Sequence, residues 1–436
     1  MKHLFFGGIH PKYNKELSTG VTDFRTLEPN TVVVPMLQHI GAPCTPLVAV
    51  GDRVLKGQKI GDGEGLCVPV HSSVSGTVIA VEPRPHVSGQ QVMAVVIEND
   101  FRYDAVTVNP VSGQDEDAVL HAIREAGIVG MGGAAFPGNV KALSALGHVD
   151  TLIANACECE PYITADDFLL RARAEQVLEG MQIIRGLLKP ERVVLAVEDN
   201  KKEAIANVKS LLSRYPGVEL AVLPTRYPQG AEKQLIVAVT GREVPSGKLP
   251  VNVGCLVFNV STYAAIYRAV KLGQPLTERL VTVSGETVGQ PQNFQVPIGT
   301  SFHDLIEQAG GLTDATERGI CGGPMMGVAQ SDLAVPVVKA TNAILCLPKD
   351  HNGAAETPVC LRCAKCVGVC PMHLQPLYMY RYTNCENLKE LNRLGVLDCI
   401  ECGCCSFTCP GKLPLVATFR KGKALVRAQK AKEEKK

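Results

Sequence analysis

The chain contains one cysteine pattern twice, as CLRCAKCVGVCP over residues 360–371 and as CIECGCCSFTCP over residues 399–410. Both copies fit C-x2-C-x2-C-x3-C-P, the spacing that holds four-iron iron–sulfur clusters in bacterial ferredoxins. Three thiolates at intervals of three residues wrap a tight loop over three corners of one cluster, whereas the fourth points toward a neighbouring cluster. The repeat therefore predicts a small C-terminal domain built around two four-iron clusters.

The same spacing predicts that the two copies exchange their last cysteine. The ligands of each cluster are then three cysteines of one copy and the last cysteine of the other: Cys360, Cys363, Cys366 and Cys409 for the first cluster, and Cys399, Cys402, Cys405 and Cys370 for the second. Two structural zinc sites are the alternative, but zinc sites usually pair two short knuckles across a longer gap. Cys385 and Cys404 lie outside this register, and we interpret both as free thiols.

Composition limits the class of protein. The 436 residues correspond to about three domains at roughly 150 residues per domain. Hydrophobic residues make up 46% and charged residues 20%, which is typical of a folded globular protein. The net charge of +1 gives no reason to expect a nucleic-acid partner. The 17 cysteines follow no signal-peptide pattern, and no apolar run reaches the length of about 18 residues needed to cross a bilayer. We therefore expect a soluble or peripheral protein whose thiols bind metal in a reducing compartment.

Residues 1–105 contain short β segments separated by Gly, Pro and Asp turns. Residues 50–61 and 74–78 resemble the barrel-sandwich fold of biotinyl and lipoyl carriers. Those carriers place a modifiable lysine at a hairpin tip, whereas the corresponding tip here, residues 69–73, has none. We expect a barrel-sandwich scaffold without a swinging arm.

Two further regions have different patterns. Residues 106–275 alternate between helical and strand patterns, which favours an α/β layer with a parallel sheet; the helices are expected over residues 116–126, 166–188 and 201–214, and the strands over 192–197 and 219–223. Residues 276–335 return to β character and resemble the β-grasp domain called SLBB. A linker near residues 349–358 precedes the cysteine runs. From Lys412 onward, nine Lys or Arg face two Glu in a basic helical pattern.

Two loops of the α/β region carry candidate binding residues. GMGGAAFP at residues 130–137 allows a backbone to approach a phosphate closely, and Lys141 follows it. NACECEPY at residues 155–162 follows a predicted strand, which is where α/β folds bind ligands. Taken singly, each segment has an ordinary alternative, a tight turn for the first and a solvated loop for the second. Cys157 and Cys159 are too close together for a metal knuckle, and we interpret them as non-ligands.

Together these segments resemble the NADH-binding subunit of respiratory complex I and, more closely, the RnfC subunits of Rnf electron transport complexes. The resemblance covers nearly the whole chain. It rests on GIVGMGG (127–133), ECEPY (158–162), GGPMMG (322–327), both cysteine runs, and LPLV (413–416) before the basic tail. It implies a multidomain α/β fold with small β domains: a barrel-sandwich hybrid (1–105), a Rossmann-like FMN/NADH domain (106–275), an SLBB β-grasp domain (276–335), a ferredoxin-like domain with two 4Fe-4S clusters (336–411) and a basic tail (412–436).

The resemblance also implies a site for FMN and NAD(H). The residues that would bind FMN are Gly130, Gly132, Gly133, Lys141, Asn155, Glu158, Tyr227 and Asn259. Three others would position the nicotinamide and ribose of NAD(H), namely Phe136, Glu160 and Glu232. No side-chain acid or base is required for hydride exchange.

The implied function is that of a ferredoxin–NAD+ oxidoreductase subunit. NADH donates two electrons as hydride and each cluster accepts one, and a flavin is the usual converter between them. The chain would exchange hydride with NAD(H) through FMN and pass single electrons through two 4Fe-4S clusters, within a membrane-bound complex that translocates Na+ or H+. Its expected partners are membrane-embedded Rnf subunits and an iron–sulfur subunit that receives electrons from ferredoxin. We expect peripheral attachment at the cytoplasmic face of the bacterial cell membrane.

Two other interpretations stay open at this point. A corrin reductase of propanediol utilisation is similar in its flavin domain and cysteine runs, although the basic tail and the GPMMG segment favour RnfC. The second is a non-catalytic iron–sulfur carrier whose flavin and dinucleotide sites are lost. It stays open because Cys157 and Ala231 replace acidic residues of the complex I pattern.

Overall fold

Short antiparallel strands form the N-terminal part of the chain in the computed structural model, which describes residues 4–20, 24–111, 115–313, 316–348 and 358–433. One sheet has the order β2-β8-β7-β4 and a smaller sheet has the order β3-β5-β6. The strands are β2 (Thr31–Pro35), β3 (Thr45–Pro46), β4 (Arg53–Val54), β5 (Lys59–Asp62), β6 (Val70–His71), β7 (Gly76–Pro85) and β8 (Gln91–Asn99). Alternate side chains of β2, such as Val32 and Val34, are buried among those of the other strands, as the period of two in a strand requires.

A parallel sheet forms the centre of the α/β domain, and its order is β11-β10-β9-β12. The apolar face of α6 packs on one side of this sheet, whereas α4 and α7 cover the other. The elements are α2 (Glu116–Glu125), α3 (Gly138–Leu143), β9 (Thr151–Ala156), α4 (Ala165–Leu188), β10 (Arg192–Glu198), α5 (Lys202–Leu211), η1 (Leu212–Arg214), β11 (Val218–Leu223), α6 (Glu232–Thr240), η2 (Pro250–Val253), β12 (Cys255–Asn259) and α7 (Val260–Leu272). The chain runs outward from β9 to β11 and then returns to the other side of β9, so the strand order reverses between β9 and β12. Ligands of such sheets bind at the carboxyl ends of the strands at this reversal.

A six-stranded sheet of order β1-β14-β13-β17-β15-β16 forms the third domain. Its strands are β1 (Arg25–Thr26), β13 (Glu278–Ser284), β14 (Gln292–Pro297), β15 (Thr316–Cys321), β16 (Val328–Gln330) and β17 (Ala343–Pro348), and α8 (Phe302–Gln308) packs on it. The strand β17 pairs with both β13 and β15, so the domain extends past residue 335, where the sequence placed its end. The reason is the fully buried apolar run at residues 343–346, which fills a central position of the sheet. Residues 349–357 of the expected linker lie outside the described ranges.

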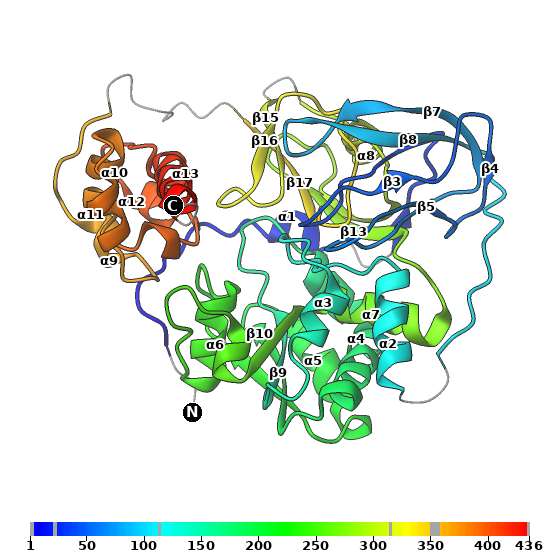
Figure 1. Cartoon of the computed structure of the whole chain (residues 1–436), viewed down its shortest axis with the longest axis horizontal. Coiled ribbons are helices and arrows are strands. Elements are labelled where there is room, and N and C mark those ends of the chain that lie inside the picture. The colour runs from blue at the N-terminus through cyan, green and yellow to red at the C-terminus, as the bar shows by residue number, and fades with distance from the viewer. Residues whose placement is uncertain (1–3, 21–23, 112–114, 314–315, 349–357, 434–436) are drawn as a thin grey trace.

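Within residues 358–433, five short helical segments and one long helix, α13, form the C-terminal domain around the two cysteine runs (Figure 1). They are α9 (Lys365–Gly368), α10 (Pro376–Asn384), α11 (Leu388–Arg393), η3 (Val396–Asp398), α12 (Cys404–Thr408) and α13 (Leu415–Glu433). The apolar residues Leu415, Phe419 and Val426 of α13 are buried in the same core as Met379 and Leu391. The expected separate tail from residue 412 is therefore corrected: the first half of α13 belongs to the C-terminal domain, because its apolar residues recur on one helical face.

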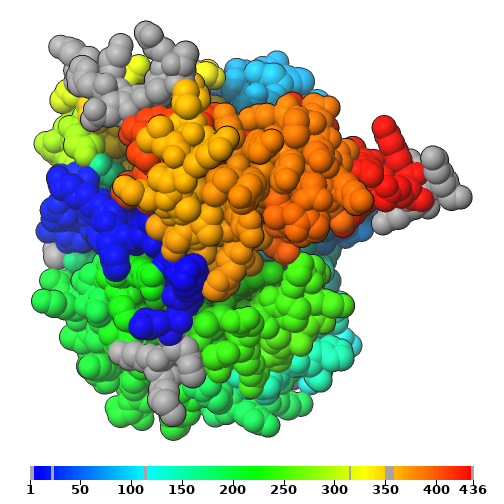
Figure 2. Space-filling model, turned by 90° about the vertical axis from the view of Figure 1, so that its left-hand side faces the viewer, coloured from blue at the N-terminus to red at the C-terminus, as the bar shows by residue number. Residues whose placement is uncertain are grey.

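The N-terminal residues 4–13 lie along the border between the α/β domain and the C-terminal domain (Figures 1 and 2). The backbone N–H of Gly8 donates to the carbonyl of Val369, and Ile9 exchanges two backbone hydrogen bonds with Tyr227. A Cβ atom on Gly7, whose φ is +74°, would lie 2.8 Å from the backbone of Cys370, so this close approach requires glycine. The short helix α1 (Glu16–Thr19) then leads toward β13 and β14. Among the described residues, no helix is both long and apolar enough to span a membrane.

Candidate functional site

Two asparagines lie opposite each other at the strand reversal. Asn155 near the end of β9 and Asn259 at the end of β12 are paired in register. The side-chain oxygen of Asn259 accepts from the N–H of Ser261 at 2.9 Å and thereby caps α7, while its Nδ2 donates to Asp166 Oδ2 at 2.6 Å. The Nδ2 of Asn155 donates to the carbonyl of Gly230 at 2.8 Å. Both amides are therefore held in fixed orientations at the position where a ligand is expected.

The glycine-rich loop lies against this position. The N–H of Gly130 donates to the carbonyl of Phe136 at 2.8 Å, which closes the loop on itself. Gly132 and Gly133 at its tip are exposed. A Cβ atom on Gly132 would lie 3.3 Å from Cβ of Asn259, and Gly133 has a φ of +116°. The loop therefore presents backbone rather than side chains beside β12, as binding of a phosphate requires.

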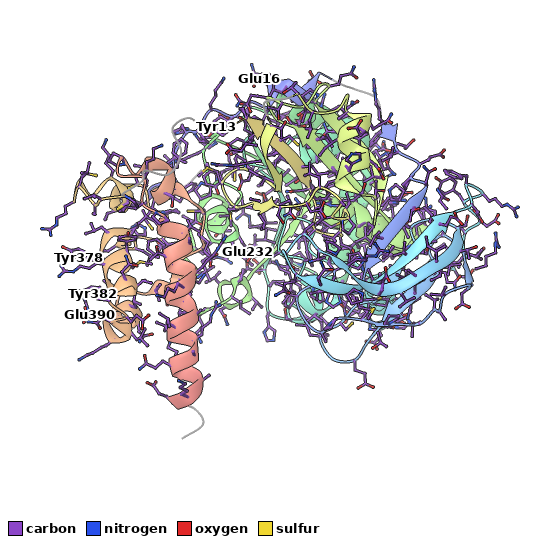
Figure 3. All side chains as sticks on the ribbon, turned by 90° about the horizontal axis from the view of Figure 1, so that it is seen from above. Tyr13, Glu16, Glu232, Tyr378, Tyr382 and Glu390 are labelled. Carbon is purple, nitrogen blue, oxygen red and sulfur yellow. The ribbon has the colours of Figure 1, made fainter. Side chains whose placement is uncertain are left out.

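A cation and an anion form a pair next to the loop. Lys141 on α3 and Glu232 at the start of α6 form an ion pair of 2.6 Å between Nζ and Oε1. Their side chains are 27% and 39% exposed, so a ligand can reach both. Glu232 lies between the C-terminal domain and the rest of the chain, whereas Tyr378, Tyr382 and Glu390 lie on the far side of that domain (Figure 3). A bound anion would compete with Glu232 for the ammonium of Lys141.

Glu158 has a different environment from the one expected for a residue that faces a ligand. Its backbone has a φ of +45°, and its carboxylate is turned toward the start of α4. There Oε1 accepts from the N–H of Asp166 at 2.6 Å, and Oε2 lies 4.0 Å from Nζ of Lys15. Burial raises the pKa of Glu158 to about 8. The side chain therefore caps a helix that supplies Asp166 to the site.

Two buried lysines, neither of them indicated by a sequence pattern, hold the acidic loop from behind. The Nζ of Lys15 donates to the carbonyls of Glu158 at 2.8 Å and Glu160 at 3.0 Å. The Nζ of Lys201 donates to the carbonyl of Cys157 at 2.6 Å. Neither lysine belongs to a recognisable motif, and Lys15 comes from a coil more than 140 residues away in sequence, so no local pattern indicates the contact.

Glu160 and Tyr227 connect three domains. The carboxylate of Glu160 accepts from the N–H groups of Met325 at 3.1 Å and Met326 at 3.0 Å, in the GPMMG segment of the third domain. Burial raises the pKa of this carboxyl to about 7. The hydroxyl of Tyr227 lies 3.4 Å from Oε1 of Glu160 and donates to the carbonyl of Cys402 at 2.7 Å. Tyr227 therefore joins the acidic loop to the second cysteine run.

The eight cysteines of the two runs line two separate hollows. Each hollow contains three cysteines of one run and the last cysteine of the other: Cys360, Cys363, Cys366 and Cys409 in the first, and Cys370, Cys399, Cys402 and Cys405 in the second. The structure thus brings the cysteines together in the exchanged grouping that the spacing predicts. Cys404 also lines the second hollow, whereas Cys385 is exposed and lies in neither.

The strand reversal and the second hollow are connected through one short series of contacts. Asn155 donates to the carbonyl of Gly230, whose N–H donates to Sγ of Cys159 at 3.2 Å. Cys159 is buried in a cluster with Tyr227, Cys402, Cys404 and Ile9, where apolar atoms fill the space between the domains. The thiol of Cys157, by contrast, is buried in the core beneath α6 and does not face the site.

Three protein-family models match successive parts of the chain. The RnfC barrel-sandwich hybrid domain matches residues 3–102, the Nuo51 FMN-binding domain matches residues 123–268, and the SLBB domain matches residues 280–329. These matches confirm the three expected domain types and their order. The six-stranded sheet extends the SLBB domain beyond its expected end at residue 335, because β17 pairs with β13.

Among curated proteins, the C subunit of the Na(+)-translocating ferredoxin:NAD(+) oxidoreductase complex of Acetobacterium woodii is 45% identical, and the match covers 99% of each chain. The C subunits of the ion-translocating oxidoreductase complexes of Serratia proteamaculans and Pseudomonas aeruginosa are each 42% identical, over 97% and 99% of this chain. The chain spans only 61% and 56% of the length of these two relatives.

Among solved structures, the crystal structure of an NAD+-reducing [NiFe]-hydrogenase in the H2-reduced state matches 74% of this chain and 68% of its own, with a TM-score of 0.50 at 20% identity. At this identity the likeness concerns the fold. The identity to the Acetobacterium protein over nearly the whole of both chains, together with the three matched domains, shows that the chain belongs to the RnfC family of ion-translocating oxidoreductase complexes.

Proposed function

We propose that the chain is the NAD(H)-reacting, electron-transferring subunit of a membrane-bound ferredoxin:NAD+ oxidoreductase that translocates Na+ or H+. Membership of the RnfC family and the match to an FMN-binding domain support this oxidoreductase function. One structural observation carries it: a short series of contacts leads from the strand reversal through Gly230, Cys159 and Tyr227 to the second cysteine hollow, where the Tyr227 hydroxyl lies 2.7 Å from the carbonyl of Cys402. These contacts make a short path for electrons between the two.

The residues at the strand reversal fit FMN. When bound, FMN would accept the hydride of NADH as two electrons and release them singly. The exposed backbone at the tip of the glycine-rich loop and the ammonium of Lys141 suit a phosphate, and Glu158 orders the acidic loop by capping α4. The proposed FMN site consists of Gly130, Gly132, Gly133, Lys141, Asn155, Tyr227 and Asn259, and Glu158 supports it from behind the acidic loop instead of contacting the flavin.

Three residues are proposed to position NAD(H). Phe136 ends the glycine-rich loop and is partly exposed, which suits contact with the nicotinamide. A phosphate on Lys141 would release the carboxylate of Glu232, which could then accept from a ribose hydroxyl. Glu160 already accepts from two N–H groups, so we assign it a positioning role: it holds the segment at residues 322–327 against the acidic loop instead of contacting the ribose.

Each cysteine hollow is proposed to hold one 4Fe-4S cluster, which supplies one-electron transfer when bound. Apolar side chains complete both hollows and support this; those of the second limit the access of water to its largely buried thiols, whereas Cys360 and Cys363 of the first are exposed. Leu413 and Leu415 line the first hollow, and Met379 and Phe419 line the second. The first cluster would be held by Cys360, Cys363, Cys366 and Cys409, and the second by Cys399, Cys402, Cys405 and Cys370.

Attachment at the cytoplasmic face of the membrane is proposed through the exposed half of α13. Arg427, Lys430 and Lys432 are exposed there. Each basic residue near an anionic surface contributes about 1 kcal/mol to binding. The proposed partners are the membrane-embedded subunits of the complex and an iron–sulfur subunit that receives electrons from ferredoxin.

The experiment uses the full chain reconstituted with iron, sulfide and FMN under anaerobic conditions. We expect NADH to bleach the flavin absorbance and to support reduction of ferricyanide, and we expect Asn259→Ala to weaken both by removing the cap of α7. If NADH neither bleaches the flavin nor reduces the acceptor, the proposed enzymatic function is wrong. The clusters have a separate test: zinc bound by four sulfurs in the cysteine runs, with no EPR signal after reduction with dithionite, would contradict them.

A further inference from the structure

Two loops of the barrel-sandwich domain, the β2–β3 connection and the β5–β6 connection, bring one histidine and two cysteines together in its interior. His39 follows β2, Cys44 directly precedes β3, and Cys67 lies just before β6. The three residues are 6%, 5% and 3% exposed. They lie outside the two cysteine runs and outside the proposed FMN site, and they belong to no sequence motif described above.

The three potential ligand atoms lie at distances that suit one metal ion. The Sγ atoms of Cys44 and Cys67 are 3.4 Å apart, and Nε2 of His39 is 3.6 Å from Sγ of Cys67 and 4.0 Å from Sγ of Cys44. In a tetrahedral zinc site, bond lengths of about 2.3 Å to sulfur and about 2.0 Å to nitrogen separate two sulfurs by about 3.8 Å and sulfur from nitrogen by about 3.5 Å. Shifts of a few tenths of an ångström would place all three atoms around a single ion.

The protonation of the imidazole is the one that metal binding requires. The backbone N–H of Val68 points at Nε2 of His39 at 3.3 Å, and because an N–H can only donate, Nε2 carries the lone pair. The ring proton is therefore on Nδ1, which lies 3.3 Å from the carbonyl of Ile40. Metal-binding histidines commonly donate their second N–H to a backbone carbonyl in this way. A metal ion would take the place of the long contact from Val68.

The donor set also suits burial of a divalent cation. Two thiolates balance the charge of Zn²⁺, and a neutral imidazole adds none, so the complex has no net charge in the apolar interior. Within the described ranges, no fourth His, Cys, Asp or Glu atom joins the group. The fourth ligand would be a water molecule or the carbonyl of Val68, which lies 3.3 Å from Sγ of Cys44.

We propose that His39, Cys44 and Cys67 bind one Zn²⁺ ion that fastens the β2–β3 loop of the barrel-sandwich domain to its β5–β6 loop. The location gives this site a connection to the α/β domain. The N–H of Ile40, the residue after His39, donates to the carbonyl of Ala135 in the glycine-rich loop at 3.1 Å. The zinc ion would therefore anchor the segment against which the glycine-rich loop rests.

The test measures zinc in the full chain, produced and purified anaerobically from a medium supplemented with iron and zinc. Elemental analysis gives the zinc content, and X-ray absorption at the zinc edge gives the ligands without interference from iron. We expect about one zinc per chain, bound by two sulfurs and at least one imidazole nitrogen. The double variant Cys44→Ala/Cys67→Ala should lose this zinc. The matched control Cys255→Ala/Cys346→Ala, which removes two thiols that are buried elsewhere, should retain it.

Four results would overturn the proposal. The first two concern the wild-type chain: it contains no zinc, or its zinc is bound by four sulfurs, as expected for occupation of a cysteine run. The third is a zinc content that is unchanged in Cys44→Ala/Cys67→Ala. The fourth is a disulfide between Cys44 and Cys67 in the anaerobically isolated chain. If the double variant does not fold, the zinc content and absorption spectrum of the wild-type chain decide the question by themselves.

Discussion

At the scale of single residues, Tyr227 joins the acidic loop to the second cysteine run. Its ring is buried between the domains, and its hydroxyl donates to the carbonyl of Cys402. The sequence resemblance implied that Tyr227 belongs to the FMN site, but it gave no indication that the same residue contacts a cysteine run 175 residues away. Motifs identify residues by type and local spacing, whereas such a contact depends on how whole domains pack.

Replacing Tyr227 with Phe removes the hydroxyl and retains the ring. The buried carbonyl of Cys402 then loses its donor, which should lower the free energy of unfolding by about 1–3 kcal/mol. Urea unfolding, monitored by the cluster absorbance, measures the effect. Tyr263→Phe is the matched control, because the Tyr263 hydroxyl makes a long contact of 3.5 Å with the carbonyl of Ile153 inside the α/β domain. Equal midpoints for wild type and Tyr227→Phe would contradict the account of this contact.

Glu160 predicts a pH dependence of stability. Burial raises its pKa from 4.5 to about 7, so the folded chain binds this proton more tightly than the unfolded chain does. The corresponding stabilisation is complete below about pH 4.5 and is lost as the pH rises to about 7, by at most about 1.4 kcal/mol per pH unit. Glu160→Gln should therefore make the fall in stability between about pH 5 and about pH 7 shallower. Glu158 still titrates in the same direction and leaves a residual slope.

Chemical unfolding at several pH values measures that slope. Glu307→Gln, at an exposed position of α8, should leave it unchanged. An identical slope for wild type and Glu160→Gln would show that Glu160 is not the group responsible.

At the scale of helices and strands, local patterns predicted most of the α/β domain. The apolar face at residues 166–188 and the apolar run at residues 192–197 correspond closely to α4 and β10. The sequence could not predict that β17 completes the sheet of the third domain or that β1 joins its edge, because both pairings connect distant segments. The sequence pattern also predicted a separate basic tail at the position of α13, since basic residues alternate with the apolar residues of its buried face.

The packing of α13 predicts a large effect from one substitution. Phe419 is 1% exposed and lines the second cysteine hollow, so Phe419→Ala should leave a cavity and lower the stability of the C-terminal domain by about 3–5 kcal/mol. Arg427→Ala, at an exposed position of the same helix, should change stability by less than about 0.5 kcal/mol. Loss of cluster absorbance in a denaturant titration measures both. Similar midpoints for the two variants would show that α13 is not part of this core.

At the scale of the whole molecule, the N-terminal segment connects the α/β domain to the C-terminal domain, and the GPMMG segment connects the third domain to the α/β domain. Gly8 and Ile9 make the first connection through backbone hydrogen bonds, and Met325 and Met326 donate to Glu160 from the third domain. The spacing of the cysteines was sufficient to predict their grouping, because all eight lie between residues 360 and 409. The position of their domain beside the strand reversal required the structure, since residues from both ends of the chain meet there.

The most direct test of the central claim, that the site at the strand reversal and the cysteine-bound clusters exchange electrons, is reoxidation by NAD+. The reconstituted full chain is reduced with dithionite, separated from excess reductant and mixed anaerobically with NAD+. We predict that the EPR signal of the reduced clusters disappears while the ultraviolet absorbance of the reduced nicotinamide shows the formation of NADH, with two electrons lost for each NADH formed. Clusters that stay reduced in the presence of NAD+, with no NADH formed, would contradict the account.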